Sequence, residues 1–261
     1  MADIHPSAVV SPDCELGENC RIGPFCVVGA DVSLGQDVIL HSHVVVEGRT
    51  RIGDRCEVFP FASIGHRPQD LKYKGEPSTI DIGADNVIRE YVTINPGTEG
   101  GAMTTRVGSG CLLMVGAHVA HDCAIGDGVI LANNVTLAGH VTVEDRVIIG
   151  GLSAVRQFVR IGHNAMIGGM SGVEHDVIPF GLVMGERAWL HGLNLVGMKR
   201  AGMSRETMQR LNSAFDSLFG EEGTFAERRK KVAEQFGDED TVAQILKFIE
   251  AQISRGVLQP K

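Results

Sequence analysis

Aliphatic residues recur along this chain at every sixth position. A first series of Val, Leu and Ile runs from residue 4 to residue 64 and resumes over residues 82 to 94. A second series keeps the same spacing from residue 107 to residue 173. Neither the helical period of about 3.6 residues nor the strand period of two explains a spacing of six. A fixed longer period indicates a solenoid built from repeated units.

The positions around each aliphatic residue are also regular. The fourth residue after it is small or β-branched, and the next residue is often glycine, as at Gly17, Gly23, Gly35, Gly53, Gly108 and Gly126. Six residues make a short strand and a turn, and three such units close a coil of eighteen. We expect glycine to serve the corners, because it adopts unusual backbone angles at least cost. The pattern predicts a mainly β protein, with a parallel β-helix over residues 1–185 whose coils stack about 4.8 Å apart.

Two insertions interrupt the repeat, over residues 66–79 and 95–106. Insertions into a solenoid project from one face, which is often the binding face. The repeat ends near Pro179, and a helical period follows, so we expect an α-helical domain over residues 186–261. Thr224 and Glu227 predict a capping box, and Asp240 is the expected N-cap of the last helix. The expected apolar helix faces are Met208, Leu211, Phe215 and Leu218, and then Val242, Ile245, Leu246, Ile249 and Ile253.

The six cysteines fit the repeat. Each stands four residues after an aliphatic position: Cys14, Cys20, Cys26, Cys56, Cys111 and Cys123. We interpret them as small buried side chains. Neither a disulfide framework nor a zinc cluster is favoured, because no secretion signal and no paired CxxC spacing is present.

Charge and hydropathy narrow the class of protein further. The formal net charge is −8, which argues against a nucleic-acid-binding domain. No run reaches the roughly 18 apolar residues of a membrane span, and the first residues lack a basic segment followed by an apolar one. We therefore expect a cytoplasmic protein without a membrane span.

Several segments resemble the UDP-N-acetylglucosamine O-acyltransferases, the hexapeptide-repeat family that begins lipid A synthesis. They are Ile22-Gly23-Pro24-Phe25-Cys26, Gln69-Asp70-Leu71-Lys72-Tyr73, His118-Val119-Ala120-His121-Asp122-Cys123, Ile130-Leu131-Ala132-Asn133-Asn134 and Leu137-Ala138-Gly139-His140-Val141. The resemblance implies a left-handed β-helix, although parallel crossovers are generally right-handed. It also implies a homotrimer with active sites between subunits.

The family's activity is the expected activity of this chain. By resemblance, it transfers a 3-hydroxyacyl chain from acyl carrier protein to the sugar 3-hydroxyl of UDP-N-acetylglucosamine. No cofactor is implied, because the acyl donor is the phosphopantetheine thioester of the carrier protein. A basic run near the C-terminus could meet that acidic protein, although such runs are more often solvated helix faces.

His121 is the expected general base, because imidazole takes and returns protons near neutral pH. The family's catalytic histidine matches His121, and Asp122 is its expected polarising partner, if a corner turns the two side chains toward each other. Adding eighteen places Gly139 one coil above His121, where its bare N–H could stabilise an oxyanion. Gln157 continues this column one coil further.

Other residues match the family's ligand contacts. His118 and His140 flank the expected base, Asp70 and Lys72 lie in the first insertion, and Asn194 and Arg200 match nucleotide contacts. An arginine suits a diphosphate, whereas Asp70 and Lys72 could also be ordinary loop residues. Gly169 matches the family's acyl-chain ruler and, having no side chain, favours a long chain.

Three positions depart from the family pattern. Arg156 and Asn95 replace histidines, and Ala201 stands where another basic residue is common. These departures surround the expected sugar and nucleotide sites. They leave open a 3-amino sugar as the acceptor, which would give an amide instead of an ester.

Three other functions compete with this one. A later N-acyltransferase of the same pathway carries an extra N-terminal uridine-binding domain, whereas repeats here begin at Ile4. A zinc hydratase could use His118, His121 and His140, but the histidine spacing differs from that of the γ-class carbonic anhydrases, so we expect no metal. A non-enzymatic scaffold would not need a histidine–aspartate pair below a bare glycine.

Overall fold

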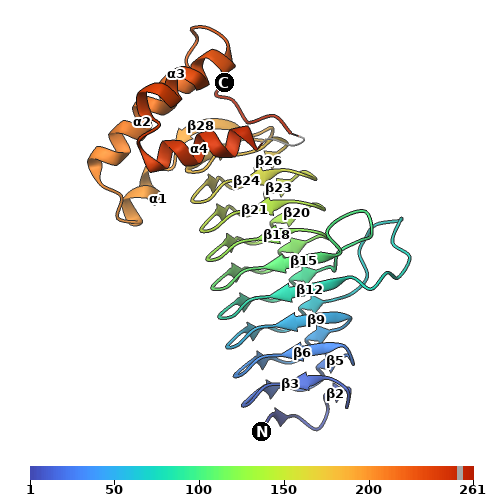
Figure 1. Ribbon diagram of the computed structural model, residues 1–261. Coiled ribbons are helices and arrows are strands. Elements are labelled where there is room, and N and C mark those ends of the chain that lie inside the picture. The colour runs from blue at the N-terminus through green and yellow to red at the C-terminus, as the bar shows by residue number, and fades with distance from the viewer. Residues whose placement is uncertain (252–254) are drawn as a thin grey trace.

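The computed structural model describes residues 1–251 and 255–261. Most of the chain is a three-sided column of stacked coils, which Figure 1 shows rising from the blue N-terminus to the helices. Successive short strands fall on three different walls, and each pairs in parallel with strands one coil away. The predicted parallel β-helix is confirmed.

The three walls are sheets A, B and C. Sheet A contains β1 (Asp3–Ile4), β4 (Arg21–Ile22), β7 (Ile39–Leu40), β10 (Glu57–Val58), β13 (Val87–Ile88), β16 (Leu112–Leu113), β19 (Ile130–Leu131), β22 (Ile148–Ile149), β25 (Met166–Ile167), β27 (Gly181–Met184) and β28 (Trp189–Leu193). Sheet B contains β2 (Val9–Val10), β5 (Val27–Val28), β8 (Val45–Val46), β11 (Ser63–Ile64), β14 (Thr93–Ile94), β17 (His118–Val119), β20 (Thr136–Leu137), β23 (Ala154–Val155) and β26 (Gly172–Val173). Sheet C contains β3 (Glu15–Leu16), β6 (Val32–Leu34), β9 (Arg49–Ile52), β12 (Thr79–Ile82), β15 (Thr104–Val107), β18 (Ala124–Ile125), β21 (Thr142–Val143) and β24 (Arg160–Ile161).

The aliphatic repeat forms the inside of the column. Ile4 pairs with Ile22, which pairs with Leu40, so an inward position returns after each coil. Most of these residues are fully buried, among them Leu40, Ile64 and Leu131. Because successive residues of a strand point to opposite faces, the preceding residue of each pair faces outward.

The glycines of the repeat serve close stacking, and the prediction that they supply the corner conformation is wrong. Positive φ falls three residues after the inward position, usually on other residue types, as at Phe25 (59°) and His43 (61°). A Cβ added to Gly23 would lie 2.9 Å from the carbonyl carbon of His41, and one on Gly53 would lie 2.7 Å from that of Gly83. The glycines are therefore required because the next coil passes too close for a side chain.

The cysteines are free thiols, as predicted. Cys14 is half-buried and the other five are buried. The Cys26 thiol lies 2.7 Å from the carbonyl oxygen of His41 in the next coil, to which it donates a hydrogen bond. Burial raises the pKa of Cys111 to about 11 and that of Cys123 to about 12, so these thiols stay protonated and unreactive at neutral pH.

Both insertions leave the column at the same edge. Residues 65–78 connect β11 to β12, and residues 95–103 connect β14 to β15, so both pass from sheet B to sheet C. Figure 1 shows the two loops projecting side by side from the column. We call this edge the BC corner and name the AB and CA corners in the same way.

The C-terminal part begins with one more strand pair. β28 pairs antiparallel with β27, although it lies beyond residue 185, where the sequence predicts the end of the β-helix. The domain boundary stays a prediction. The helices are α1 (Leu195–Arg200), α2 (Arg205–Phe219), α3 (Phe225–Phe236) and α4 (Asp240–Glu250). None of them is both long and apolar enough to cross a membrane, within the residues described.

The helix ends test the capping predictions. The Thr224–Glu227 capping box is present at the start of α3. The prediction that Asp240 caps α4 is wrong: Glu239 holds the N-cap position without a side-chain hydrogen bond, and Asp240 is the first helical residue. The predicted apolar faces of α2 and α4 do pack inward, except that Ile253 lies outside the described residues. Helix α1 was not predicted.

Arg160 of β24 anchors helix α4 to the last coils and is itself held by a buried ion pair. Arg160 contacts the fully buried carboxylate of Asp176 at 2.8 Å, donates to the carbonyl oxygen of Phe248 at 3.1 Å and lies over the Phe248 ring. The helices thus lie against the C-terminal end of the column, as predicted (Figure 1).

Truncating an inward residue is expected to destabilise the column. Leu34 of β6 is 2% exposed, so Leu34→Ala should lower the free energy of unfolding by about 2–5 kcal/mol through lost burial and a cavity. Guanidinium denaturation measures this change. The neighbouring outward residue provides the control, because Ser33→Ala should change stability by less than about 0.5 kcal/mol. Equal effects of the two variants would contradict the assignment of inward and outward positions.

Candidate active site

His121 and Asp122 form a hydrogen-bonded pair at the BC corner. Nδ1 of His121 lies 2.8 Å from Oδ2 of Asp122, and the two side chains are 10% and 1% exposed. Both residues follow the end of β17, and Asp122 has a φ of 59°. This left-handed corner turns the two adjacent side chains toward each other, whereas along a strand they would point apart.

The carboxylate of Asp122 is enclosed by the second loop. Thr98 donates to it from its hydroxyl at 2.6 Å and from its backbone N–H at 3.1 Å. The backbone N–H of Asp122 donates to the Thr105 hydroxyl at 2.8 Å. Burial opposes ionisation, but the hydrogen bonds from Thr98 and His121 outweigh it and lower the pKa of Asp122. The carboxylate is therefore charged at neutral pH.

Gly139 stacks directly on the imidazole of His121, as the repeat predicts. A Cβ added to Gly139 would lie 2.6 Å from Nε2 of His121. The next residue confirms the stacking of the two coils, because the N–H of His140 donates to the carbonyl oxygen of His121 at 3.0 Å. The N–H of Gly139 donates to no acceptor among residues 1–251 and 255–261. It can therefore donate to a ligand at this corner.

Two more histidines flank His121. The His140 ring meets the His121 ring edge-on and stacks on Phe158, with centroids 4.9 and 4.4 Å apart. His118 lies on the outer face of sheet B, where its Nδ1 lies 2.7 Å from the Thr93 hydroxyl. Burial lowers the pKa of both His118 and His140, which favours their neutral forms as hydrogen-bonding groups.

The first loop brings its predicted ligand residues toward the same corner. Burial has the largest effect on the pKa of His140, followed by the charges of Asp122 and His121. The charges of Asp70 and Lys72 have smaller effects on the same pKa, which places the first loop near this histidine. The Asp70 carboxylate accepts the backbone N–H of Lys72 at 2.9 Å, which shapes this turn, while the Lys72 side chain is exposed. Gln157, also exposed, continues the His121–Gly139 column.

The remaining predicted residues lie at other corners. Gly169 lies at the AB corner, packed on Gly151. Asn194 lies at the CA corner, where it caps α1 through the N–H of Gly197 and donates to the carbonyl oxygen of Asn164. Arg200 ends the same helix. Within one chain, these three residues do not face His121.

The structure also bears on the zinc alternative. His121, Asp122 and His140 have possible ligand atoms within 4.8 Å of one another. His118, which the alternative required, is not part of this group. Its Nδ1 instead pairs with Thr93. The carboxylate of Asp122 is already occupied by Thr98 and His121.

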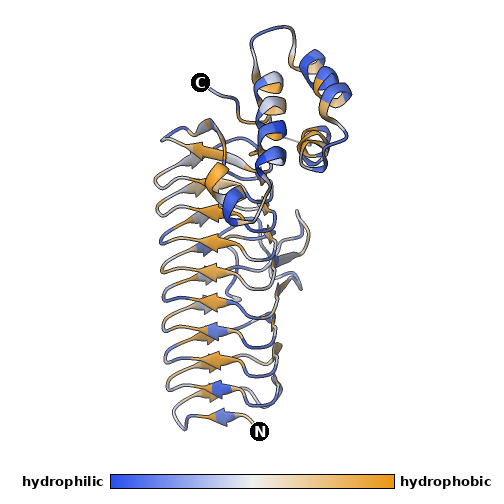
Figure 2. Cartoon of the chain, turned by 90° about the vertical axis from the view of Figure 1, so that its left-hand side faces the viewer, coloured by the Kyte–Doolittle hydropathy of each residue, from blue (hydrophilic) through white to orange (hydrophobic). Residues whose placement is uncertain are grey.

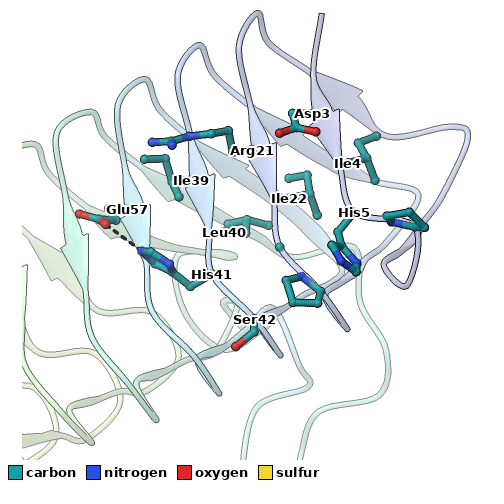
Figure 3. A pocket seen from close by; sticks show the side chains of 13 residues that line it. Asp3, Ile4, His5, Arg21, Ile22, Ile39, Leu40, His41, Ser42 and Glu57 are labelled. Carbon is teal, nitrogen blue, oxygen red and sulfur yellow. Dashed lines mark hydrogen bonds and ion pairs between the residues drawn. The ribbon is translucent and has the colours of Figure 1, made fainter.

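A groove on the N-terminal coils of sheet A is a different surface feature. Figure 3 shows its lining residues, with Asp3 and Arg21 on one side and His41 hydrogen-bonded to Glu57 at 2.8 Å. None of the predicted site residues lines it. His41 pairs with Glu57, and Nδ1 of the second histidine, His5, pairs with the Ser7 hydroxyl.

The repeats and the site define a class of protein. Residues 4–30 and 104–139 match the model of bacterial transferase hexapeptide repeats, so the chain is a hexapeptide-repeat transferase. Residues 176–258 match the second domain of UDP-N-acetylglucosamine O-acyltransferase.

Comparison with individual proteins narrows the class to one family. The acyl-[acyl-carrier-protein]–UDP-N-acetylglucosamine O-acyltransferases of Caulobacter vibrioides and Rickettsia canadensis are 52% and 53% identical, over 99% and 97% of this chain and 98% and 96% of their own lengths. The structure of LpxA from Acinetobacter baumannii superposes with a TM-score of 0.95 at 40% identity, covering 98% of this chain and 99% of that one. The chain belongs to the UDP-N-acetylglucosamine O-acyltransferase family.

Proposed function

We propose that the chain transfers a 3-hydroxyacyl group from acyl carrier protein to the 3-position of UDP-N-acetylglucosamine, as the first step of lipid A synthesis. The relatives named above act on these two substrates by name. The observation that carries the proposal is the His121–Asp122 pair stacked against Gly139, whose N–H has no acceptor among the residues described. These groups supply a base and an oxyanion donor in one place.

The mechanism follows from the hydrogen bond to Asp122. Because Nδ1–H of His121 donates to the carboxylate, the lone pair of Nε2 is free to accept the sugar hydroxyl proton. The sugar oxygen then attacks the thioester carbonyl carbon, and the N–H of Gly139 stabilises the resulting oxyanion. As the intermediate collapses, the carbon–sulfur bond breaks, and the imidazolium returns the proton to the departing thiolate. Every step uses groups of the protein and its substrates, without a cofactor.

We also propose a homotrimer, since the predicted ligand residues occupy different corners of one chain. A neighbouring copy could bring Asn194, Arg200 and Gly169 to the BC corner of the first. The outward residues of sheet A form an apolar strip along most of the column, which Figure 2 shows as a run of orange strands. The strip consists of Val87, Leu112, Ile130, Ile148, Met166 and Leu182. Apolar patches of this kind mark subunit interfaces, and C3 closure suits a column with flat faces.

The outward residues of sheet C are of the opposite kind. They include Arg51, Asp81, Arg106 and Thr142. This wall therefore suits contact with solvent.

Both proposed substrates belong to the interior of the cell, so the proposed location is the cytoplasm.

The structure adds detail to the family departures. Asn95 is 7% exposed and donates to the carbonyl oxygen of His66 at 3.0 Å, so it fastens the base of the first loop. Arg156 is exposed near Gln157, and Ala201 is the C-cap of α1. These positions could alter the sugar contacts, so the acceptor's 3-substituent is part of the test.

A direct assay tests the function. Purified protein is incubated with UDP-N-acetylglucosamine or its 3-amino analogue and a series of 3-hydroxyacyl carrier proteins. We expect ester formation with the natural sugar and a preference for long acyl chains. Absence of transfer to either acceptor would contradict the proposal, and amide formation alone would change the acceptor. Metal analysis of the same sample, together with activity after chelation, tests the zinc alternative.

A further inference from the structure

The loop over residues 95–103 contacts the catalytic pair at one side chain. Thr98 is 4% exposed, and its hydroxyl oxygen lies 2.6 Å from Oδ2 of Asp122, the same oxygen that accepts from Nδ1 of His121. The N–H of Thr98 lies 3.1 Å from both carboxylate oxygens. A buried carboxylate gripped by two donors of one residue has little freedom to rotate.

The rest of the loop is shaped to deliver Thr98 to this place. The N–H of Gly101 donates to the carbonyl oxygen of Thr98 at 3.0 Å, which closes a turn over the carboxylate. A Cβ on Gly101 would collide with the Asp122 carboxyl group, so glycine is needed for this approach. The N–H of Glu99 donates to the carboxylate of Glu76 at 3.0 Å and ties the two loops together.

We propose that Thr98 is a positioning residue of the active site, which holds the Asp122 carboxylate ionised and aimed at Nδ1 of His121. Thr98 touches neither reacting atom and acts through Asp122. The inference rests on the proposed acyl transfer.

The proposal predicts a change in pH dependence with a definite sign. Hydrogen bonds to a carboxylate favour its charged form, so removing the Thr98 hydroxyl lets burial raise the pKa of Asp122. A protonated Asp122 carries no charge, so it accepts only weakly from Nδ1 of His121 and no longer stabilises the imidazolium. The acid limb of the kcat profile should therefore move to higher pH. Besides His121, the titratable group facing the carboxyl group is His140, whose Nδ1 lies 3.9 Å from Oδ2 of Asp122. The charges of Asp70 and Lys72 act on the pKa of His140.

Three threonine variants test the role. Thr98→Val keeps the shape and the backbone donor but removes the hydroxyl, and we expect kcat to fall about 10- to 100-fold. KM for UDP-N-acetylglucosamine should stay unchanged, and the acid limb should rise by about one pH unit. Thr98→Ser, which restores the hydroxyl, should recover most of the activity. Thr79→Val is the matched control, because Thr79 pairs with Thr104 beside the same loop without touching Asp122.

A double-mutant cycle separates this role from a structural one. If Thr98 acts through Asp122, Thr98→Val should have almost no further effect on kcat in the Asp122→Ala background. Multiplicative losses, or full activity of Thr98→Val, would overturn the proposal. If the valine variant does not assemble, Thr98→Ala and Thr98→Ser are compared in the same cycle. An inactive wild-type protein would instead refute the proposed function itself.

Discussion

His121→Ala is expected to lower kcat for acyl transfer by about 10²- to 10⁴-fold while leaving the proposed trimer intact. The substitution removes the imidazole that Gly139 stacks on and that pairs with Asp122. The side chain lies outside the aliphatic core, so the coils keep their packing. Steady-state kinetics and size-exclusion chromatography measure the two outcomes.

An exposed histidine provides the control for this variant. His175 lies near the C-terminal end of the column, and His175→Ala should keep full activity. Full activity of His121→Ala would end the assignment of the general base. Loss of activity together with loss of assembly would instead assign His121 a structural role.

Gly139→Ala is expected to reduce kcat by about 100-fold, because the added methyl group occupies the place of the imidazole. A Cβ at this position would lie 2.5 Å from Cε1 and 2.6 Å from Nε2 of His121, so the ring must move. The N–H of residue 139 is retained. The loss therefore measures the position of the base and not the number of oxyanion donors.

The control for this variant is a glycine with more room. A Cβ on Gly29 meets its nearest neighbour at 3.4 Å, so Gly29→Ala should fold and act as the wild type. Thermal unfolding should show Gly139→Ala folded. A fully active Gly139→Ala would show that the imidazole does not occupy this position during the reaction.

The sequence predicts the column because its signal is periodic and local. One inward aliphatic residue per short strand specifies three walls, and a return after eighteen residues correctly places Gly139 on His121. The cysteines follow from the same rule. The role of the repeat glycines does not follow from the sequence, since the spacing shows that a small residue is needed but not whether backbone angle or space requires it.

The surroundings of the catalytic pair could not be predicted from spacing. Thr98 reaches Asp122 through the fold of an irregular loop, which has no period. The orientation of Asp122 depends on a left-handed φ, which sequence does not reveal for an aspartate. The capping contacts of Asn194 belong to a six-residue helix too short for an amphipathic pattern. The second insertion is rich in glycine and threonine, but its composition does not show which residue reaches Asp122.

The N-terminal coil leaves the lower edges of β1, β2 and β3 without a neighbouring strand among the residues that the structure describes. Open edges invite other chains to add strands, and columns could then join end to end into fibres. Here the edge strands are two residues long and Pro6 interrupts the rim, while the charges of Asp3 and Glu15 repel an identical rim. A stack of coils therefore leaves an open strand edge at its end, and the residues of that end must prevent other chains from pairing with it.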